Sequence, residues 1–234
     1  LVLPGEEPNC HLGGHWISFF PRPVHWIFGE KEIRLAEKSL GLKTAGKRFV
    51  HRDAKLGAVY FIHSAADVLK LMEAENGLMW TAHPRIKSST GYPDKYKGEA
   101  FYQSPHYLGA AWKAMPADYS RDRLGERVLD LLDDMNDWGQ PKKILGEADL
   151  FELNKESELY GHLNVNYLKM DKLPRFEEGW DEVLETLRKG RYFTSTGEVL
   201  IPSLRINGKE FAERTRVDGE GQIMIEADLR WTFP

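Results

Sequence analysis

The chain has little of what several large classes of protein require. It contains a single cysteine, Cys10, among 234 residues, which excludes an internal disulfide framework. No apolar stretch approaches the roughly 18 residues that a membrane-spanning helix needs. The formal net charge is −4 and there is no long basic run, so the charge pattern typical of nucleic-acid-binding proteins is missing. We therefore expect neither a membrane span nor a nucleic-acid partner.

Sequence motifs of two common enzyme classes are also missing. The chain has no glycine-rich dinucleotide motif and no phosphate-binding P-loop, and no serine stands in a nucleophile elbow. Nucleotide binding and serine-hydrolase chemistry therefore have no support. The hydrophobic fraction of 41% and the charged fraction of 29% are those of an ordinary globular protein. A chain of this length forms one large domain, or one domain with an appendage.

Short apolar runs alternate with helical periods along the first 190 residues. One helix is predicted to begin at Ser64, a good N-cap, and to end at the Asn76-Gly77 pair. Two more helices are predicted, at about 120–139 and over 181–190. Strands are predicted at 2–3, 16–20, 58–62, 78–81 and 144–153. This succession is typical of βα units around a parallel sheet or barrel.

The pattern changes after Gly190. Three β-like runs follow, separated by Asn207-Gly208 and Asp218-Gly219, which are hairpin turn signals. We therefore expect a barrel over residues 1–195 and a β-strand appendage over 196–234, similar to the start of a sandwich domain. The chain opens on a strand-like run without a cap and closes in another strand. We expect it to be a piece of a longer protein, with any targeting signal upstream.

Several ionisable side chains stand where a predicted strand gives way to a loop. His15 follows two glycines, His83 precedes a proline, His162 follows a glycine, and Glu7 closes the opening run. Strand ends are where α/β enzymes hold metal ligands and catalytic groups, and imidazole and carboxylate are ligands for Zn, Mn or Fe. The pattern predicts a metal site, against the alternative that each histidine is an ordinary surface or interior residue.

Other polar residues are candidates for proton transfer, for orienting a metal ligand or for substrate binding at the same site. Glu147 and Asp149 share one strand face by their spacing. One of them could act as a base or orient a ligand histidine. The alternative is that one of them simply caps the next segment. His63 stands between a strand and a helix, where it transfers a proton or helps to cap that helix. Arg85 and Lys87 follow the AHP segment. Two interpretations are open: they bind a phosphate or carboxylate of a small-molecule substrate, or they belong to a solvated loop.

The order of the motifs along the chain is more informative than any one of them. A strand ending in PGEE is followed by GH, by a strand ending in AHP, by a late histidine, and then by a helix, GRYFTSTG and a β tail. Over about residues 1–210 this order resembles that of the PHP (polymerase and histidinol phosphatase) metallohydrolases, within them the carbaryl-hydrolase-like branch.

The resemblance implies an α/β fold, a distorted (β/α)7 TIM-like barrel whose strand ends hold two or three divalent metal ions, commonly Zn, Mn or Fe. It implies that the metal ligands are Glu7, His15, His83 and His162. The activity it implies is metal-dependent hydrolysis, in which metal-bound water attacks a phosphoester, ester or amide bond. Glu147 or His63 is then the first candidate for proton transfer.

The chain departs from the family pattern at two places. At the last metal ligand along the chain, family members usually show Asp-x-His. Here Tyr160 takes the place of that aspartate, two residues before His162. One metal is therefore expected to be lost or held differently. Family members also begin with a strand that carries His-x-His, and nothing before Leu1 supplies it. We therefore expect the barrel to be incomplete at its N-terminus. Either the chain is whole and its site is incomplete and inactive, or it is a fragment and the missing ligands lie upstream.

A function of a different class is compatible with the same sequence. A non-catalytic, degenerate barrel would bind a glycan or a protein through exposed aromatic side chains of the stretch that follows the AHP segment. Those aromatics are Tyr92, Tyr96, Phe101 and Tyr102. Metal content distinguishes this binding module from the hydrolase.

Overall fold

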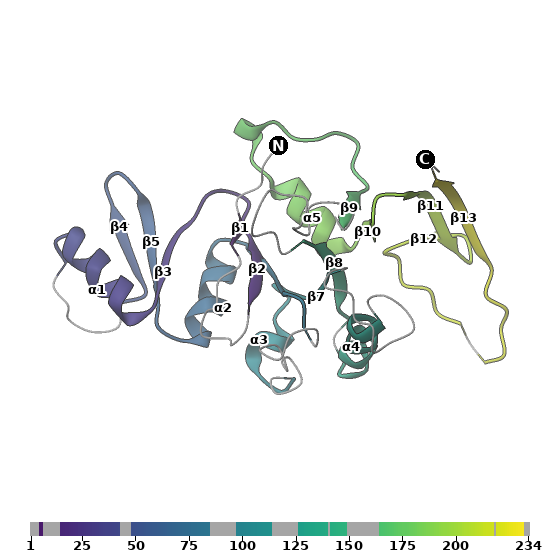
Figure 1. Cartoon of the computed structure of the whole chain (residues 1–234), viewed down its shortest axis with the longest axis horizontal. Helices are drawn as coiled ribbons and strands as arrows, with labels where there is room; N and C mark the ends of the chain where they lie inside the picture. The colour runs from purple at the N-terminus through teal and green to yellow at the C-terminus, as the bar shows by residue number, and fades with distance from the viewer. Residues whose placement is uncertain are drawn as a thin grey trace, which may run out of the picture.

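The centre of the protein is an open five-stranded sheet with the strand order β1-β2-β6-β7-β8 (Figure 1). The computed structural model describes residues 5–6, 15–42, 48–84, 97–113, 126–139, 141–148, 164–217 and 219–231. The strands of this sheet are β1 (Gly5–Glu6), β2 (Trp16–Phe19), β6 (Leu78–Thr81), β7 (Tyr107–Lys113) and β8 (Lys143–Glu147). Strands β6, β7 and β8 are parallel, whereas β2 is antiparallel to both β1 and β6.

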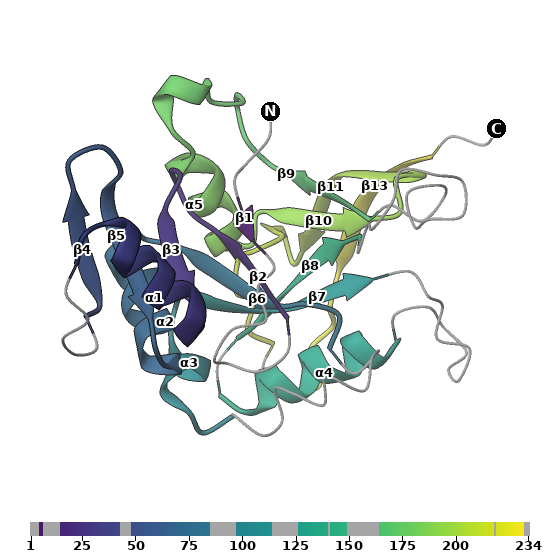
Figure 2. The ribbon, with the colours of Figure 1, turned by 60° about the vertical axis from the view of Figure 1, so that its left-hand side comes forward.

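Helices cover both faces of this sheet (Figure 2). On one face lie α2 (Ala65–Ala74), α3 (Ala100–Gln103) and α4 (Glu126–Asp137), and on the other lies α5 (Asp181–Lys189). Alternate residues of β6 serve the two faces: Met79 packs with α2 and α4, while Leu78 and Trp80 pack with α5. Burial on both faces explains the continuous apolar run of this strand. No helix in the described ranges is long and apolar enough to cross a membrane.

Local sequence signals set two of the helix boundaries. The Ser64 hydroxyl accepts a hydrogen bond from the backbone N–H of Asp67, which caps the first turn of α2. Helix α5 ends at Gly190, whose φ of +73° is the left-handed conformation that glycine adopts without strain. The sequence-based predictions for these two helices are confirmed.

A smaller sheet with the strand order β3-β5-β4 lies to one side of the central sheet (Figure 1). Its strands are β3 (His25–Phe28), β4 (Val50–Asp53) and β5 (Gly57–Ile62), and α1 (Glu30–Ser39) packs on it. A partly buried polar contact joins it to α2. The Tyr60 hydroxyl and the Arg22 guanidinium both donate to the carboxylate of Glu75, the C-cap of α2. Burial and this carboxylate raise the pKa of Tyr60 to about 12.

The last third of the described chain contributes five further strands, together with a short 3-10 helix and α5. Strands β9 (Val165–Leu168) and β10 (Tyr192–Ser195) form an antiparallel pair, with η3 (Phe176–Glu178) and α5 between them. A three-stranded sheet in the order β12-β11-β13 follows, built from β11 (Val199–Ile206), β12 (Lys209–Glu210) and β13 (Ile225–Trp231). The strands predicted after Gly190 are therefore present, while the boundary at residue 195 stays a prediction.

The prediction of a distorted (β/α)7 barrel is wrong. In the described residues the strands form four separate sheets with five α-helices, and no sheet closes. A βα barrel needs parallel strands, but β2 runs antiparallel to its neighbours. The strand predicted at 58–62 is β5, which pairs with β3 and β4 in the side sheet instead of joining the central one. The fold is mixed α/β with several small sheets.

A buried lysine stands at the edge of the central sheet from which β7 and β8 begin. The Lys142 ammonium donates to the carbonyl oxygens of Tyr102 and Tyr107, at 2.8 and 2.7 Å, and lies over both tyrosine rings. It thereby ties α3 and β7 to the start of β8. Burial, with a smaller contribution from the Lys143 charge, lowers the pKa of Lys142 from its ordinary value of 10.5 to about 8.

We predict that this lysine makes the stability of the protein depend on pH. Below the folded-state pKa both states hold the proton, and the cost of the buried charge is fully present. Between the folded and unfolded pKa values the unfolded chain holds more protons, so the free energy of unfolding rises with pH. From about pH 7 to about pH 9.5 the expected gain is about 2 kcal/mol. Lys142→Met should remove this gain in denaturant titrations, and an unchanged pH dependence would contradict the assignment.

Candidate functional site

Three parallel strands, β6, β7 and β8, end at one edge of the central sheet, and a fourth, β2, begins there (Figure 2). His83 follows β6 and Glu147 is the last residue of β8. Because β2 runs antiparallel to β6, its first residues also lie at this edge: the His15 carbonyl accepts a hydrogen bond from Ala82 N–H at 3.0 Å. Carboxyl ends of parallel strands are the usual place for a binding site in such sheets.

The structure brings two of the predicted ligands together. The rings of His15 and His83 meet edge to face, with their centroids 5.6 Å apart. His83 is buried, with 1% of its surface exposed, and its φ is +29°. Positive φ is strained for a residue with a side chain, and such strain is retained mostly at functional positions. Pro84 follows directly, and a proline restricts the backbone of the residue before it.

Glu147 holds His83 in place. One carboxylate oxygen, Oε1, accepts a hydrogen bond from the backbone N–H of His83 and lies 3.0 Å from its ring Nδ1. Glu147 itself is 8% exposed, and a buried carboxylate is costly unless it is paired or hydrogen-bonded. The prediction that Glu147 orients a ligand histidine therefore has a matching geometry.

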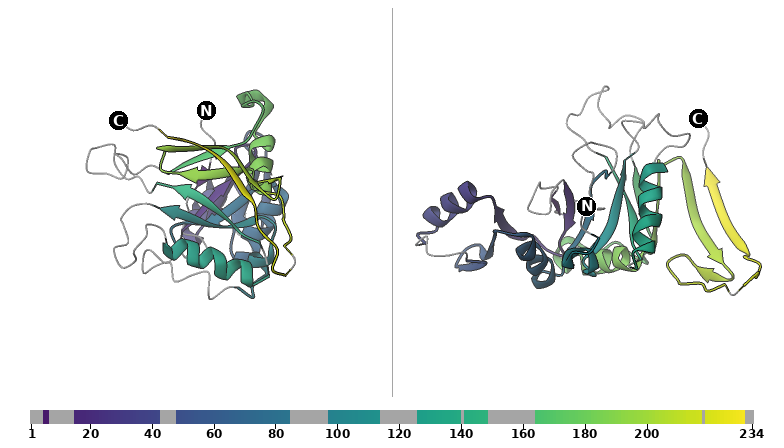
Figure 3. Two further views of the ribbon diagram at one scale, coloured as in Figure 1. Left: turned by 90° about the vertical axis from the view of Figure 1, so that its right-hand side faces the viewer. Right: turned by 90° about the horizontal axis from the view of Figure 1, so that it is seen from below.

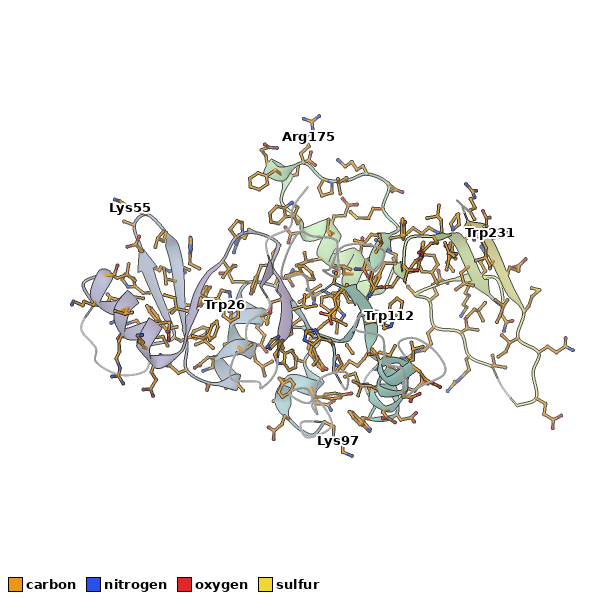
Figure 4. All side chains as sticks on the ribbon, in the orientation of Figure 1. Trp26, Lys55, Lys97, Trp112, Arg175 and Trp231 are labelled. Carbon is orange, nitrogen blue, oxygen red and sulfur yellow. The ribbon has the colours of Figure 1, made fainter. Side chains whose placement is uncertain are left out.

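An asparagine that sequence analysis did not identify stabilises the same edge. The Asn164 side chain donates from Nδ2 to the carbonyl oxygens of Trp112, at 2.7 Å, and Glu147, at 2.9 Å. It thus joins the ends of β7 and β8. Figure 4 labels Trp112 near the end of β7. The available sequence signal was the NVN segment at the start of β9, since asparagine is depleted in strands and two in alternation mark one face.

Side-chain amides replace strand pairing on the outer edge of β8. Asn166 accepts from the backbone N–H of Gly146 and donates to its carbonyl oxygen, both at 2.8 Å, and Thr194 Oγ1 donates to Asn166. Gly146 is required for this approach, because an added Cβ would lie 2.5 Å from Thr194 Cγ2. Strands β9 and β10 are in this way fixed against the residue that precedes Glu147.

Of the remaining predicted site residues, His63 is the one that lies within the described ranges, and it is not part of this cluster. His63 lies at the junction of β5 and α2, where its ring Nε2 is 3.1 Å from the Arg48 carbonyl oxygen and its backbone N–H donates to Asp67. The structure does not bring His63 together with His83, so its proton-transfer role stays a prediction. The predictions for Glu7, Arg85, Lys87, Asp149, Tyr160 and His162 lie outside the described residues.

The prediction of exposed binding aromatics is wrong for two of the four residues. Phe101 is 3% exposed and Tyr102 is fully buried, and both belong to the core between α3 and the sheet. Their rings pack against Trp16 and Tyr107. Tyr92 and Tyr96 lie outside the described residues.

The donor set fits a divalent metal ion in part. Within the described ranges no group of three or more His, Cys, Asp or Glu side chains is placed to hold an ion. A histidine oriented by a carboxylate, as His83 is, is nevertheless how metal-binding histidines are usually held, and the His15 ring contacts it. His15 and His83 would be the ligands, with Glu147 on the far side of the His83 ring.

Comparison of the chain with models of known protein families, with curated proteins and with solved structures yields no match. The resemblance to the PHP metallohydrolases therefore rests on the order of its motifs alone.

We predict that Gly146 is tightly packed against the side chains of Asn166 and Thr194. Gly146→Ala should lower the free energy of unfolding by about 1–3 kcal/mol, because the new methyl group meets Thr194 Cγ2. Thr194→Ser removes that carbon and keeps the hydroxyl, so the double variant should recover part of the loss in denaturant titrations. Thr194→Ser alone is the control. Equal stability of Gly146→Ala and the wild type, or no recovery in the double variant, would refute this packing.

Proposed function

We propose that the chain is a metal-dependent hydrolase of PHP type that acts on a phosphoester, ester or amide bond of a small-molecule substrate. The observation that carries the proposal is the His83–Glu147 pair, buried at the carboxyl ends of parallel strands with the His15 ring beside it. The order of the motifs that contain these residues supports the same family.

Glu147 selects which nitrogen of His83 is available to a ligand. With the carboxylate 3.0 Å from Nδ1, that nitrogen carries the ring hydrogen and donates a hydrogen bond to Glu147. The lone pair then lies on Nε2, on the opposite side of the ring. Carboxylate–imidazole pairs of this kind fix the tautomer and increase the basicity of metal-binding histidines.

A divalent ion at this position, Zn, Mn or Fe, would lower the pKa of a bound water molecule and stabilise the negative charge that develops during hydrolysis. Glu147 is engaged through Oε1 by both the backbone and the ring of His83. We therefore assign it the positioning of His83 and not proton transfer. Arg85 and Lys87 remain the proposed substrate-binding residues.

We predict that the wild-type chain binds at least one Zn or Mn ion and that His83→Ala abolishes this binding. Glu147→Gln should weaken metal binding about 10- to 100-fold, because the neutral amide no longer increases the basicity of His83. Equilibrium dialysis with elemental analysis measures both effects. His25→Ala is the matched control, since His25 is exposed on β3.

Less than one metal ion per wild-type chain, or unchanged metal content in His83→Ala, would refute the proposal. Hydrolysis of chromogenic phosphate, ester and amide substrates then tests the reaction itself. Activity should be lost with a chelator, return with the added metal, and be absent from His83→Ala. Hydrolysis that a chelator leaves unchanged would exclude a metal-dependent reaction.

A further inference from the structure

In the part of the chain that the structure describes, β13 is the outermost strand of the C-terminal sheet and has a neighbouring strand on one side only. Among the described strands it pairs with β11 alone, and it stands at the end of the order β12-β11-β13 (Figure 3). All seven of its residues are exposed, Leu229 to 48% and Trp231 to 59%. Figure 4 shows Trp231 on this outer strand. Natural sheets usually cover or blunt such an edge, because its unpaired N–H and C=O groups recruit another strand.

The two faces of β13 differ in chemistry. One face carries alternate apolar residues and the other carries alternate charges, as the period of two in a strand requires. The apolar face consists of Ile225, Ala227, Leu229 and Trp231, and the charged face of Glu226, Asp228 and Arg230. Opposite residues of β11 continue the apolar face, for Val199 pairs with Trp231 and Ile206 with Ile225. This makes an exposed apolar patch next to a free edge, which is typical of an interaction surface.

We propose that β13 pairs antiparallel with β13 of a second copy of this chain, about a two-fold axis at Leu229. Leu229 then faces the partner's Leu229 on the apolar face, and Trp231 covers the small side chain of the partner's Ala227. On the charged face Asp228 and Arg230, which form an ion pair with each other within the chain at 3.1 Å, face the partner's Arg230 and Asp228, so that two such pairs lie side by side. The two sheets become one continuous sheet, an isologous interface formed by strand addition.

Charge complementarity selects this register over its neighbours. Directly opposite residues share a face, so apolar side chains meet apolar ones only in registers whose axis passes through a residue. An axis at Asp228 would oppose two Asp228 carboxylates, and an axis at Ala227 would oppose Glu226 and Asp228. Like charges directly opposite one another destabilise a strand pair. An axis at Asp228 would also pair Glu226 with Arg230, but only the axis at Leu229, among these three, opposes unlike charges without also opposing like ones.

Charge reversal tests this interface. Sedimentation equilibrium of the 234-residue chain should give twice its mass of 26.9 kDa. Asp228→Arg alone and Arg230→Asp alone should each be monomeric, since each places like charges opposite one another. An equimolar mixture of the two should form a heterodimer, and the double variant should dimerise again. Both residues are exposed, and circular dichroism spectra equal to that of the wild type confirm that each variant is folded.

A cross-link fixes the position of the axis. In a Cys10→Ser background, Leu229→Cys should form a disulfide between copies on oxidation, and Ala227→Cys, which faces the partner's Trp231, should not. A monomeric wild type would overturn the proposal. So would a dimer that survives both single charge reversals, because the two copies would then meet elsewhere, for instance through their apolar faces.

Discussion

The geometry at the carboxyl edge of the sheet depends on one contact, the pairing of the buried Glu147 carboxylate with His83. A carboxylate away from water needs partners for its oxygens, and His83 offers two donors from the same residue, its backbone N–H and its ring. Since His83 follows β6 and Glu147 ends β8, the contact spans the end of β7. It also supports the strained backbone of His83, which the surroundings must hold in place.

The remaining structure at this edge keeps Glu147 where the contact needs it. Asn164 ties the ends of β7 and β8 together, and Asn166 bonds both backbone groups of Gly146, the residue before Glu147. Here side-chain amides supply the hydrogen bonds that the backbone of a neighbouring strand supplies elsewhere in the sheet. Hydrogen bonds thus fix the backbone at Glu147 and at the residue before it. A carboxylate that must orient one ring nitrogen of a histidine requires such support.

Local sequence signals predicted the contents of this site better than the fold around it. His15 and His83 were identified because each stands at the end of an apolar run, and Glu147 because its spacing from Asp149 places both on one strand face; both signals are local. The barrel was predicted wrongly because closure depends on strand pairing between distant segments. The apolar pattern of β2 is equally compatible with a parallel and an antiparallel neighbour. No local sequence signal indicates that β5 joins a side sheet. Phe101 and Tyr102 were assigned to the surface from the Gly-, Pro- and Lys-rich composition around them, although both pack in the core.

The central claim is that Glu147 directs the Nε2 atom of His83 to a metal ion. A crystal structure of the chain grown with Zn or Mn, with data collected at the absorption edge of that metal, measures this directly. The account predicts an anomalous peak about 2.0–2.1 Å from His83 Nε2, next to the His15 ring, with Nδ1 still bonded to Glu147. A peak on the Nδ1 side, or none near His83 in crystals that bind the metal elsewhere, would contradict it.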